Sequence, residues 1–108
     1  MVYTIEELKQ KITPIASKYN IPAVYIFGSY ARNQATEDSD IDVLINRTGS
    51  KIVTMFDLGA FYNELNEGLK KPLDLVTEDA LTQDEVQRRT PGFSERLRRE
   101  KVVIYEQR

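Results

Sequence analysis

The chain contains no cysteine and no histidine among its 108 residues. The absence of cysteine excludes disulfides and thiolate chemistry, and it permits the cytoplasmic location that we expect. The absence of histidine excludes a histidine general base, a Ser-His-Asp triad and the usual zinc sites. Two common sources of catalytic and metal-binding groups are therefore missing from this chain.

The sequence also lacks long hydrophobic runs. A transmembrane helix needs about 18 or more consecutive apolar residues, and no such run occurs. The stretch from Met1 to Glu7 has neither a basic nor an apolar segment, so we expect no signal peptide. Apolar residues make up 41% and charged residues 30% of the chain, as in ordinary globular proteins. The length fits one domain over residues 1–108.

Charge is unevenly distributed, although the formal net charge is only −2. Residues 37–85 carry twelve acidic and four basic side chains, whereas residues 88–108 carry seven basic and three acidic ones. The basic C-terminal segment fits either a polyanionic or acidic partner or an ordinary solvated helix face. The acidic segment contains the residues with the strongest functional signal.

Hydrophobic periodicity predicts alternating helices and strands. Thr4 and Glu7 form a capping-box pattern before a helix that ends near Tyr19 and that Pro14 should kink or break. A second long helix is expected where apolar residues recur at spacings of three and four. These residues are Met55, Leu58, Tyr62, Leu65 and Leu69.

The other expected elements are shorter. They are the strands Ala23–Phe27, Asp40–Ile45, Pro72–Val76 and Val102–Tyr105 and the helices Ser29–Arg32, Leu81–Arg89 and Phe93–Arg99. The β–α–β alternation, followed by a final helix and strand, predicts an α/β or α+β fold with one sheet packed against helices.

The most informative stretch of the sequence runs from Gly28-Ser29 to Asp40-Ile41-Asp42. Residues two apart on a strand point to the same face, so Asp40 and Asp42 should project together while Ile41 enters the core. Neighbouring carboxylates repel each other, and a hard cation such as Mg²⁺ relieves that repulsion. Gly28-Ser29 offers backbone N–H groups and a hydroxyl, which suit a phosphate. The pattern therefore indicates phosphoryl or nucleotidyl transfer.

Two further residues extend this pattern. Asp74 interrupts an apolar run and fits either a third carboxylate of a two-metal site or a charged residue at the end of a sheet. Arg32 fits a phosphate contact and a salt bridge equally well.

The sequence resembles the minimal nucleotidyltransferases of the DNA polymerase β-like superfamily in three segments, Gly28–Arg32, Ser39–Leu44 and Leu73–Val76. The resemblance implies a polymerase β-like fold with a single mixed sheet. The family usually has Gly after the Ala-Arg pair, where this chain has Asn33. Asn tolerates a left-handed backbone, so the turn can survive this departure.

The resemblance also implies roles for the site residues. Asp40 and Asp42 would bind two Mg²⁺ ions, and Asp74 would bind the catalytic ion and help to activate the attacking hydroxyl. Gly28 and Ser29 would hold the triphosphate of ATP. Arg32 is the further candidate for a nucleotide contact, as noted above.

Many proteins of this kind are MntA-type antitoxins, which transfer AMP from ATP to a tyrosine of a HEPN-family ribonuclease toxin. The resemblance therefore implies an adenylyltransferase with a HEPN-domain toxin as partner, without membrane or direct nucleic-acid binding. Two alternatives remain open: an antitoxin that acts by binding alone, and a nucleotidyltransferase for small molecules. The latter usually carry an added acceptor domain, for which 108 residues leave no room.

Overall fold

The computed structural model describes residues 2–79 and 99–107, which contain four strands and three helices. The elements are α1 (Ile5–Lys18), β1 (Ala23–Phe27), α2 (Gly28–Ala31), β2 (Ile41–Asn46), α3 (Met55–Leu69), β3 (Leu73–Thr77) and β4 (Val102–Glu106). The expected helix Leu81–Arg89 and most of the expected helix Phe93–Arg99 lie outside the described residues. No helix of the described part is long and apolar enough to cross a membrane.

Helix α1 begins with the predicted capping box. The Thr4 hydroxyl accepts a hydrogen bond from the Glu7 backbone N–H at 3.1 Å, and the Glu7 carboxylate accepts one from the Thr4 N–H at 2.9 Å. The prediction was a kink or a break at Pro14, and the break is wrong, because the helix continues past this residue. Pro14 removes one hydrogen bond on the exposed side, while Leu8 and Ile12 are fully buried on the opposite side and hold the helix in place.

Helix α3 uses a slightly different apolar stripe from the predicted one. Phe61, Leu65 and Leu69 are buried, whereas Met55 is 80% exposed at the first turn. The helix ends at Lys70, whose backbone is left-handed with φ +54°. The stripe therefore enters the core through Phe61, which lies at helical spacing from Leu65 but was absent from the predicted set.

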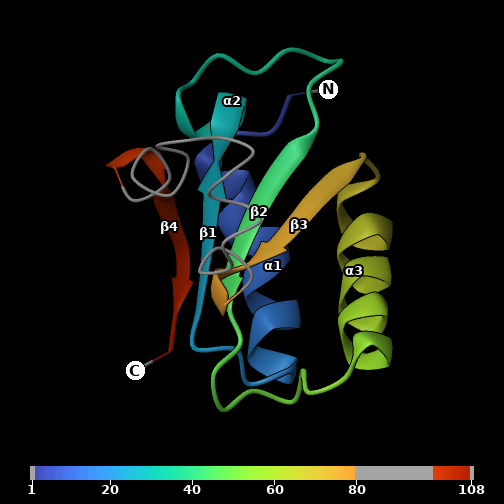
Figure 1. Ribbon diagram of the computed structural model, residues 1–108. Coiled ribbons are helices and arrows are strands. Elements are labelled where there is room, and N and C mark those ends of the chain that lie inside the picture. Colours follow the sequence, from blue (N-terminus) through green and yellow to red (C-terminus); the bar gives the residue numbers. More distant parts are fainter. Residues whose placement is uncertain (1, 80–98, 108) are drawn as a thin grey trace, which may run out of the picture.

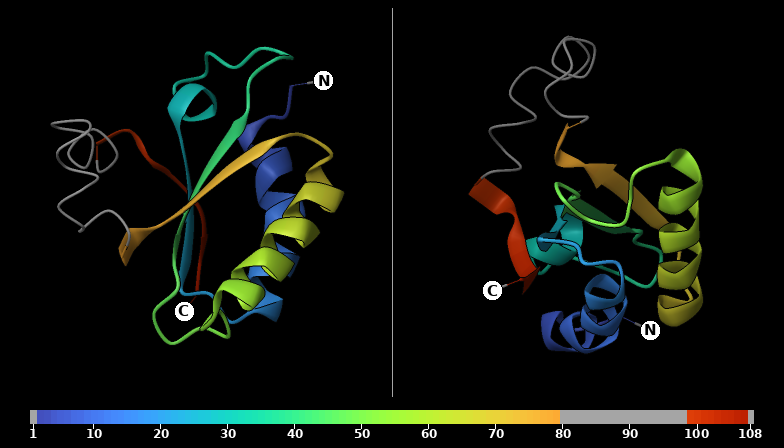
Figure 2. Two further views of the ribbon diagram at one scale, coloured as in Figure 1. Left: turned by 45° about the vertical axis from the view of Figure 1, so that its right-hand side comes forward. Right: turned by 90° about the horizontal axis from the view of Figure 1, so that it is seen from below.

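The four strands form one mixed sheet in the order β3-β2-β1-β4 (Figure 1). Strand β1 is antiparallel to β2 and β4, and β2 is parallel to β3. Helices α1 and α3 lie side by side on the same face of the sheet (Figure 2). Parallel strands need a crossover connection, and α3 provides it between β2 and β3. The mixed sheet agrees with the predicted fold class.

The main core lies between the sheet and these two helices. Ile41, Val43 and Ile45 of β2 point into it and are fully buried. The alternating residues of β2 point to the other face, where Leu44 packs in a smaller cluster with Phe27. Asp42 lies between Ile41 and Val43, so its side chain belongs to this second face.

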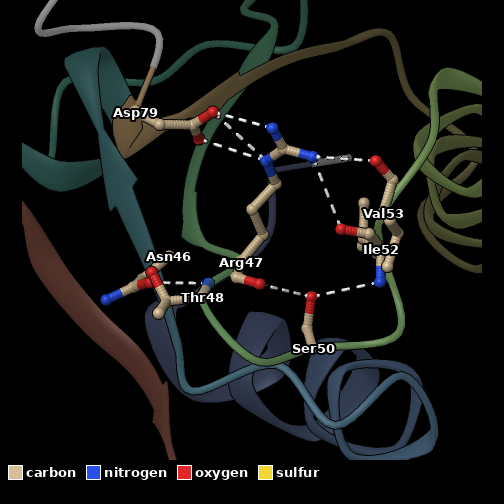
Figure 3. Close-up of polar contacts among 7 residues, drawn as sticks. All are labelled: Asn46, Arg47, Thr48, Ser50, Ile52, Val53 and Asp79. Atoms are coloured by element: carbon tan, nitrogen blue, oxygen red, sulfur yellow. Dashed lines mark hydrogen bonds and ion pairs between the residues drawn. The ribbon is translucent and has the colours of Figure 1, made fainter.

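The loop between β2 and α3 is held by Arg47 (Figure 3). Its guanidinium contacts the Asp79 carboxylate, with an Nη2–Oδ2 distance of 2.9 Å. Its Nη1 also donates to the carbonyl oxygens of Ile52 and Val53, both at 3.4 Å. Arg47 therefore links this loop to the residues that follow β3.

Candidate active site

The turn after β1 brings Gly28 against Asp42. Gly28 has φ +72°, a left-handed backbone that residues with a Cβ rarely adopt. A Cβ at this position would lie 2.2 Å from the Asp42 Oδ2 atom. Glycine is therefore required here both by the backbone and by the carboxylate beside it.

Sheet register places two of the predicted acids side by side. Asp42 is opposite Phe27 on β1 and opposite Asp74 on β3. Adjacent strands are separated by about 4.8 Å, and residues opposite each other in register share a face. The parallel pairing of β2 with β3 is thus the structural cause of this acidic pair.

Asp40 lies just before β2, which starts at Ile41, so its predicted place inside the strand was wrong by one residue. The strand starts at Ile41 because the Ile41 N–H donates to the Pro72 carbonyl at 3.0 Å, at the residue before β3. Asp40 and Asp74 are exposed, whereas Asp42 is half-buried.

The three acids interact electrostatically. The pKa of Asp42 is raised from 3.8 to about 6, mainly by burial and then by the negative charges of Asp74 and Asp40, while Arg32 acts in the opposite direction. Like charges close together disfavour ionisation, and this accounts for the second and third causes. The structure therefore places Asp42 opposite Asp74 and within the electrostatic influence of Asp40.

These carboxylates are suited to a hard cation without forming a closed ligand shell. Within residues 2–79 and 99–107, no three Asp or Glu side chains already stand in the arrangement of a metal site. Asp40 and Asp74 are exposed, so rotation about their side-chain torsions can turn both carboxylates toward Asp42. Clustered carboxylate oxygens with unbalanced charge fit Mg²⁺.

Arg32 ends helix α2 and forms a salt bridge. Its Nη1 lies 3.1 Å from the Glu100 carboxylate, and its Nε donates to the Gln34 side chain at 3.3 Å. One of its two predicted roles is therefore observed, and its charge still reaches Asp42. The next residue, Asn33, has φ +57°, which confirms that Asn accepts the left-handed turn.

Ser29 is half-buried in α2, and its carbonyl accepts a hydrogen bond from the Gln34 N–H at 2.8 Å. Sequence reasoning missed a lysine behind this turn. Lys71 Nζ donates to the Tyr30 hydroxyl at 3.1 Å and to the Glu37 carbonyl at 3.2 Å. No local signal could have revealed these contacts, because they join segments far apart in the sequence.

Comparison with known proteins identifies the class to which this fold and acidic cluster belong. The family "Polymerase beta, Nucleotidyltransferase" matches residues 10–108, and the chain belongs to this family. It is a nucleotidyltransferase, related to the MntA adenylyltransferases.

Two curated relatives cover most of the chain. A "Putative protein adenylyltransferase" of Methanocaldococcus jannaschii is 42% identical over 77 residues, which span 71% of this chain and 81% of the relative. The protein adenylyltransferase MntA of Thermococcus cleftensis is 30% identical over 82 residues, or 72% of this chain and 82% of the relative.

Solved structures share the fold. A "putative minimal nucleotidyltransferase" superimposes with a TM-score of 0.69 at 26% identity, covering 93% of this chain and 95% of that one. A toxin-antitoxin complex with AMP-PNP gives 0.68 at 17% identity, with 93% and 74% covered. A complex of a tri-AMPylated Shewanella oneidensis HEPN toxin with its MNT antitoxin gives 0.63 at 18%, with 96% and 74% covered.

Proposed function

We propose that this nucleotidyltransferase is an antitoxin that transfers AMP from ATP to a tyrosine hydroxyl of a partner HEPN-domain toxin. The observation that carries the proposal is the pairing of Asp42 with Asp74 beside Gly28, with Asp40 also acting on Asp42; this concentration of negative charge supports metal-assisted nucleotidyl transfer. Two relatives are named as protein adenylyltransferases, and two structural neighbours are toxin-antitoxin complexes, one with AMP-PNP and one with an AMPylated toxin.

The acids and the turn have separate roles in this proposal. Asp40 and Asp42 would hold two Mg²⁺ ions, and Asp74 would contribute to holding one of them. Bound Mg²⁺ would lower the pKa of the acceptor hydroxyl and stabilise the leaving pyrophosphate. Gly28 and Ser29 hold the triphosphate. Gly28 has no Cβ, so the triphosphate can approach the backbone of the turn.

The transfer step forms one bond and breaks one. The acceptor oxygen bonds to the α-phosphorus of ATP, the bond between the α-phosphorus and its bridging oxygen breaks, and pyrophosphate leaves. The hydroxyl proton passes to the Asp74 carboxylate, which is exposed and can therefore meet an incoming acceptor. In this proposal Arg32 contacts phosphate oxygens once its bond with Glu100 opens.

The test compares the wild type with Asp74→Asn, using a HEPN-domain toxin as the acceptor. We expect Asp74→Asn to retain Mg²⁺–ATP affinity in calorimetry and to lose transfer of AMP, measured as the mass gain of the toxin. Glu106→Gln is the matched control, because it neutralises an exposed acid that pairs with Ala23, at the end of β1 opposite to Gly28. Its transfer activity should equal that of the wild type.

The same experiment separates catalysis from binding. Toxin activity is measured after incubation with each protein and ATP. If Asp74→Asn silences the toxin as fully as the wild type, and neither adds AMP, the proposed transfer of AMP to the toxin is wrong. The chain would then act as an antitoxin by binding alone.

A further inference from the structure

Lys71 joins two segments that carry candidate site residues. Its Nζ donates to the hydroxyl of Tyr30 at 3.1 Å and to the carbonyl of Glu37 at 3.2 Å. Tyr30 directly follows Ser29 in α2. Glu37 belongs to the loop that leads to Asp40. One ammonium group therefore connects the turn after β1 with the approach to the acidic cluster.

The backbone beside Lys71 connects a third segment. The Pro72 carbonyl accepts a hydrogen bond from the Ile41 N–H at 3.0 Å, which starts the pairing of β2 with β3. The Lys71 carbonyl accepts one from the Asn66 side chain at 3.1 Å, which ties it to α3. Asp74 follows shortly along β3. The turn that contains Lys71 thus also fixes the strand that carries Asp74.

The surroundings make these bonds effective. Tyr30 is only 4% exposed, and Lys71 is half-buried with its Nζ 5.8 Å from the centre of the Tyr30 ring. Hydrogen bonds from a charged donor are stronger than neutral ones. Partial burial reduces the screening of the bond to Tyr30 by water, whereas the bond to Glu37 is exposed. Within the loop, Thr36 and Ser39 bond to each other, which shapes the loop but does not attach it to the sheet.

We propose that Lys71 is a positioning residue for nucleotidyl transfer. It fixes the separation between the Gly28-Ser29 turn, which holds the triphosphate, and Asp40, which holds metal. It acts through Tyr30 and the loop rather than by touching the nucleotide. This inference rests on the proposed function, because it assumes that the turn and the acids bind one Mg²⁺–ATP together.

The test compares Lys71→Met with Lys18→Met. Both changes remove one ammonium group. Lys71→Met loses two hydrogen bonds, and Lys18→Met loses an exposed ion pair with Glu64 at 2.6 Å, away from the site. Calorimetry with Mg²⁺–ATP is done in the cold, far below the unfolding temperature. Loss of a charge-assisted hydrogen bond typically corresponds to about a tenfold change in an equilibrium constant. We expect a loss of that size in affinity for Lys71→Met and none for Lys18→Met.

Hydrogen exchange supplies a second readout that does not depend on activity. The amides of Thr36, Ser39 and Ile41 should exchange faster in Lys71→Met than in the wild type, without nucleotide. Lys71→Arg should restore both affinity and protection, because guanidinium can donate to the same two oxygens. A purely structural role would lower the unfolding temperature of Lys71→Met while leaving its affinity in the cold unchanged, and that result would overturn the proposal.

The outcomes remain separable from the proposed function. Failure of the wild type to bind Mg²⁺–ATP would refute the proposed function and, with it, this inference. Equal affinity of the wild type and Lys71→Met would refute the positioning role alone. If Lys71→Met does not fold, Tyr30→Phe decides, because it keeps the buried ring and removes one of the two acceptors. Unchanged affinity and unchanged exchange in Tyr30→Phe would overturn the proposal.

Discussion

Replacement of Asp42 by Asn should stabilise the metal-free protein. In the wild type, burial and the charges of Asp74 and Asp40 raise the pKa of Asp42 from 3.8 to about 6. Between these two values the folded state binds more protons than the unfolded state does. Protonation of Asp42 therefore stabilises the folded state. This stabilisation is complete at low pH and is lost as the pH rises through about 6. Asn has nearly the same shape and carries no charge, so it escapes this loss.

The size of the effect follows from the shift and the exposure of the carboxyl. A shift of two pKa units corresponds to about 3 kcal/mol at full strength. Asp42 is only half-buried, so screening by water reduces the expected value to about 1 kcal/mol. For a domain of this size that difference raises the unfolding temperature by about 4 °C. The gain should appear above the raised pKa and vanish in acid.

The assay is urea unfolding of both proteins across this pH range, with and without Mg²⁺. The difference between the two proteins isolates Asp42, because other acids with lowered pKa, such as Asp57, titrate alike in both. Mg²⁺ should stabilise the wild type by preferential binding to the folded state and have much less effect on Asp42→Asn. Asp38→Asn is the matched control and should behave as the wild type. A metal-free Asp42→Asn no more stable than the wild type at neutral pH would refute the electrostatic argument.

Substitutions at three further positions test other parts of the structure. Gly28→Ala should lose about 1–2 kcal/mol of stability in urea unfolding, since φ +72° disfavours a Cβ. It should also lose Mg²⁺–ATP affinity in calorimetry, because the Cβ displaces the Asp42 carboxylate. Unchanged affinity would remove this turn from the site. Asn33→Gly should melt within a few degrees of the wild type, whereas Asn33→Val should lose about 1–2 kcal/mol; equal melting temperatures for both variants would contradict the importance of φ +57°. Phe61→Ala should lose about 3–5 kcal/mol of stability, because the ring is fully buried and packs edge-on against Tyr19, with the ring centroids 5.4 Å apart. A loss under 1 kcal/mol in urea unfolding would show that the core collapses around the cavity.

The fold was largely predictable because its elements follow local rules. The capping box at Thr4 and the apolar run of β1 gave element boundaries within a residue or so of those observed. The β–α–β pattern likewise predicted one sheet with helices. The unbroken helix at Pro14 was missed because tertiary burial of Leu8 and Ile12 outweighs one lost hydrogen bond.

The candidate site was predictable as a set of residues but not as an arrangement. Spacing indicated Asp40 and Asp42, whereas the role of Asp74 came from the family resemblance. In the structure, the charges of Asp74 and Asp40 both act on Asp42. The close approach of Gly28 to Asp42 depends on how β1 pairs with β2, which no local pattern specifies. The contacts of Lys71 and Glu100 likewise depend on tertiary structure, because their partners lie far away along the chain.

The parallel pairing of β2 with β3 also has a kinetic consequence. The chain between these strands includes the whole of α3, and closing so long a connection carries an entropic cost before any contact forms. We therefore expect Asp42 and Asp74 to meet late in folding, after the antiparallel hairpin of β1 and β2 has formed. Interactions absent from the transition state change the unfolding rate and leave the refolding rate nearly unaltered. An ion bound between these strands would then slow unfolding and lengthen the lifetime of the native state.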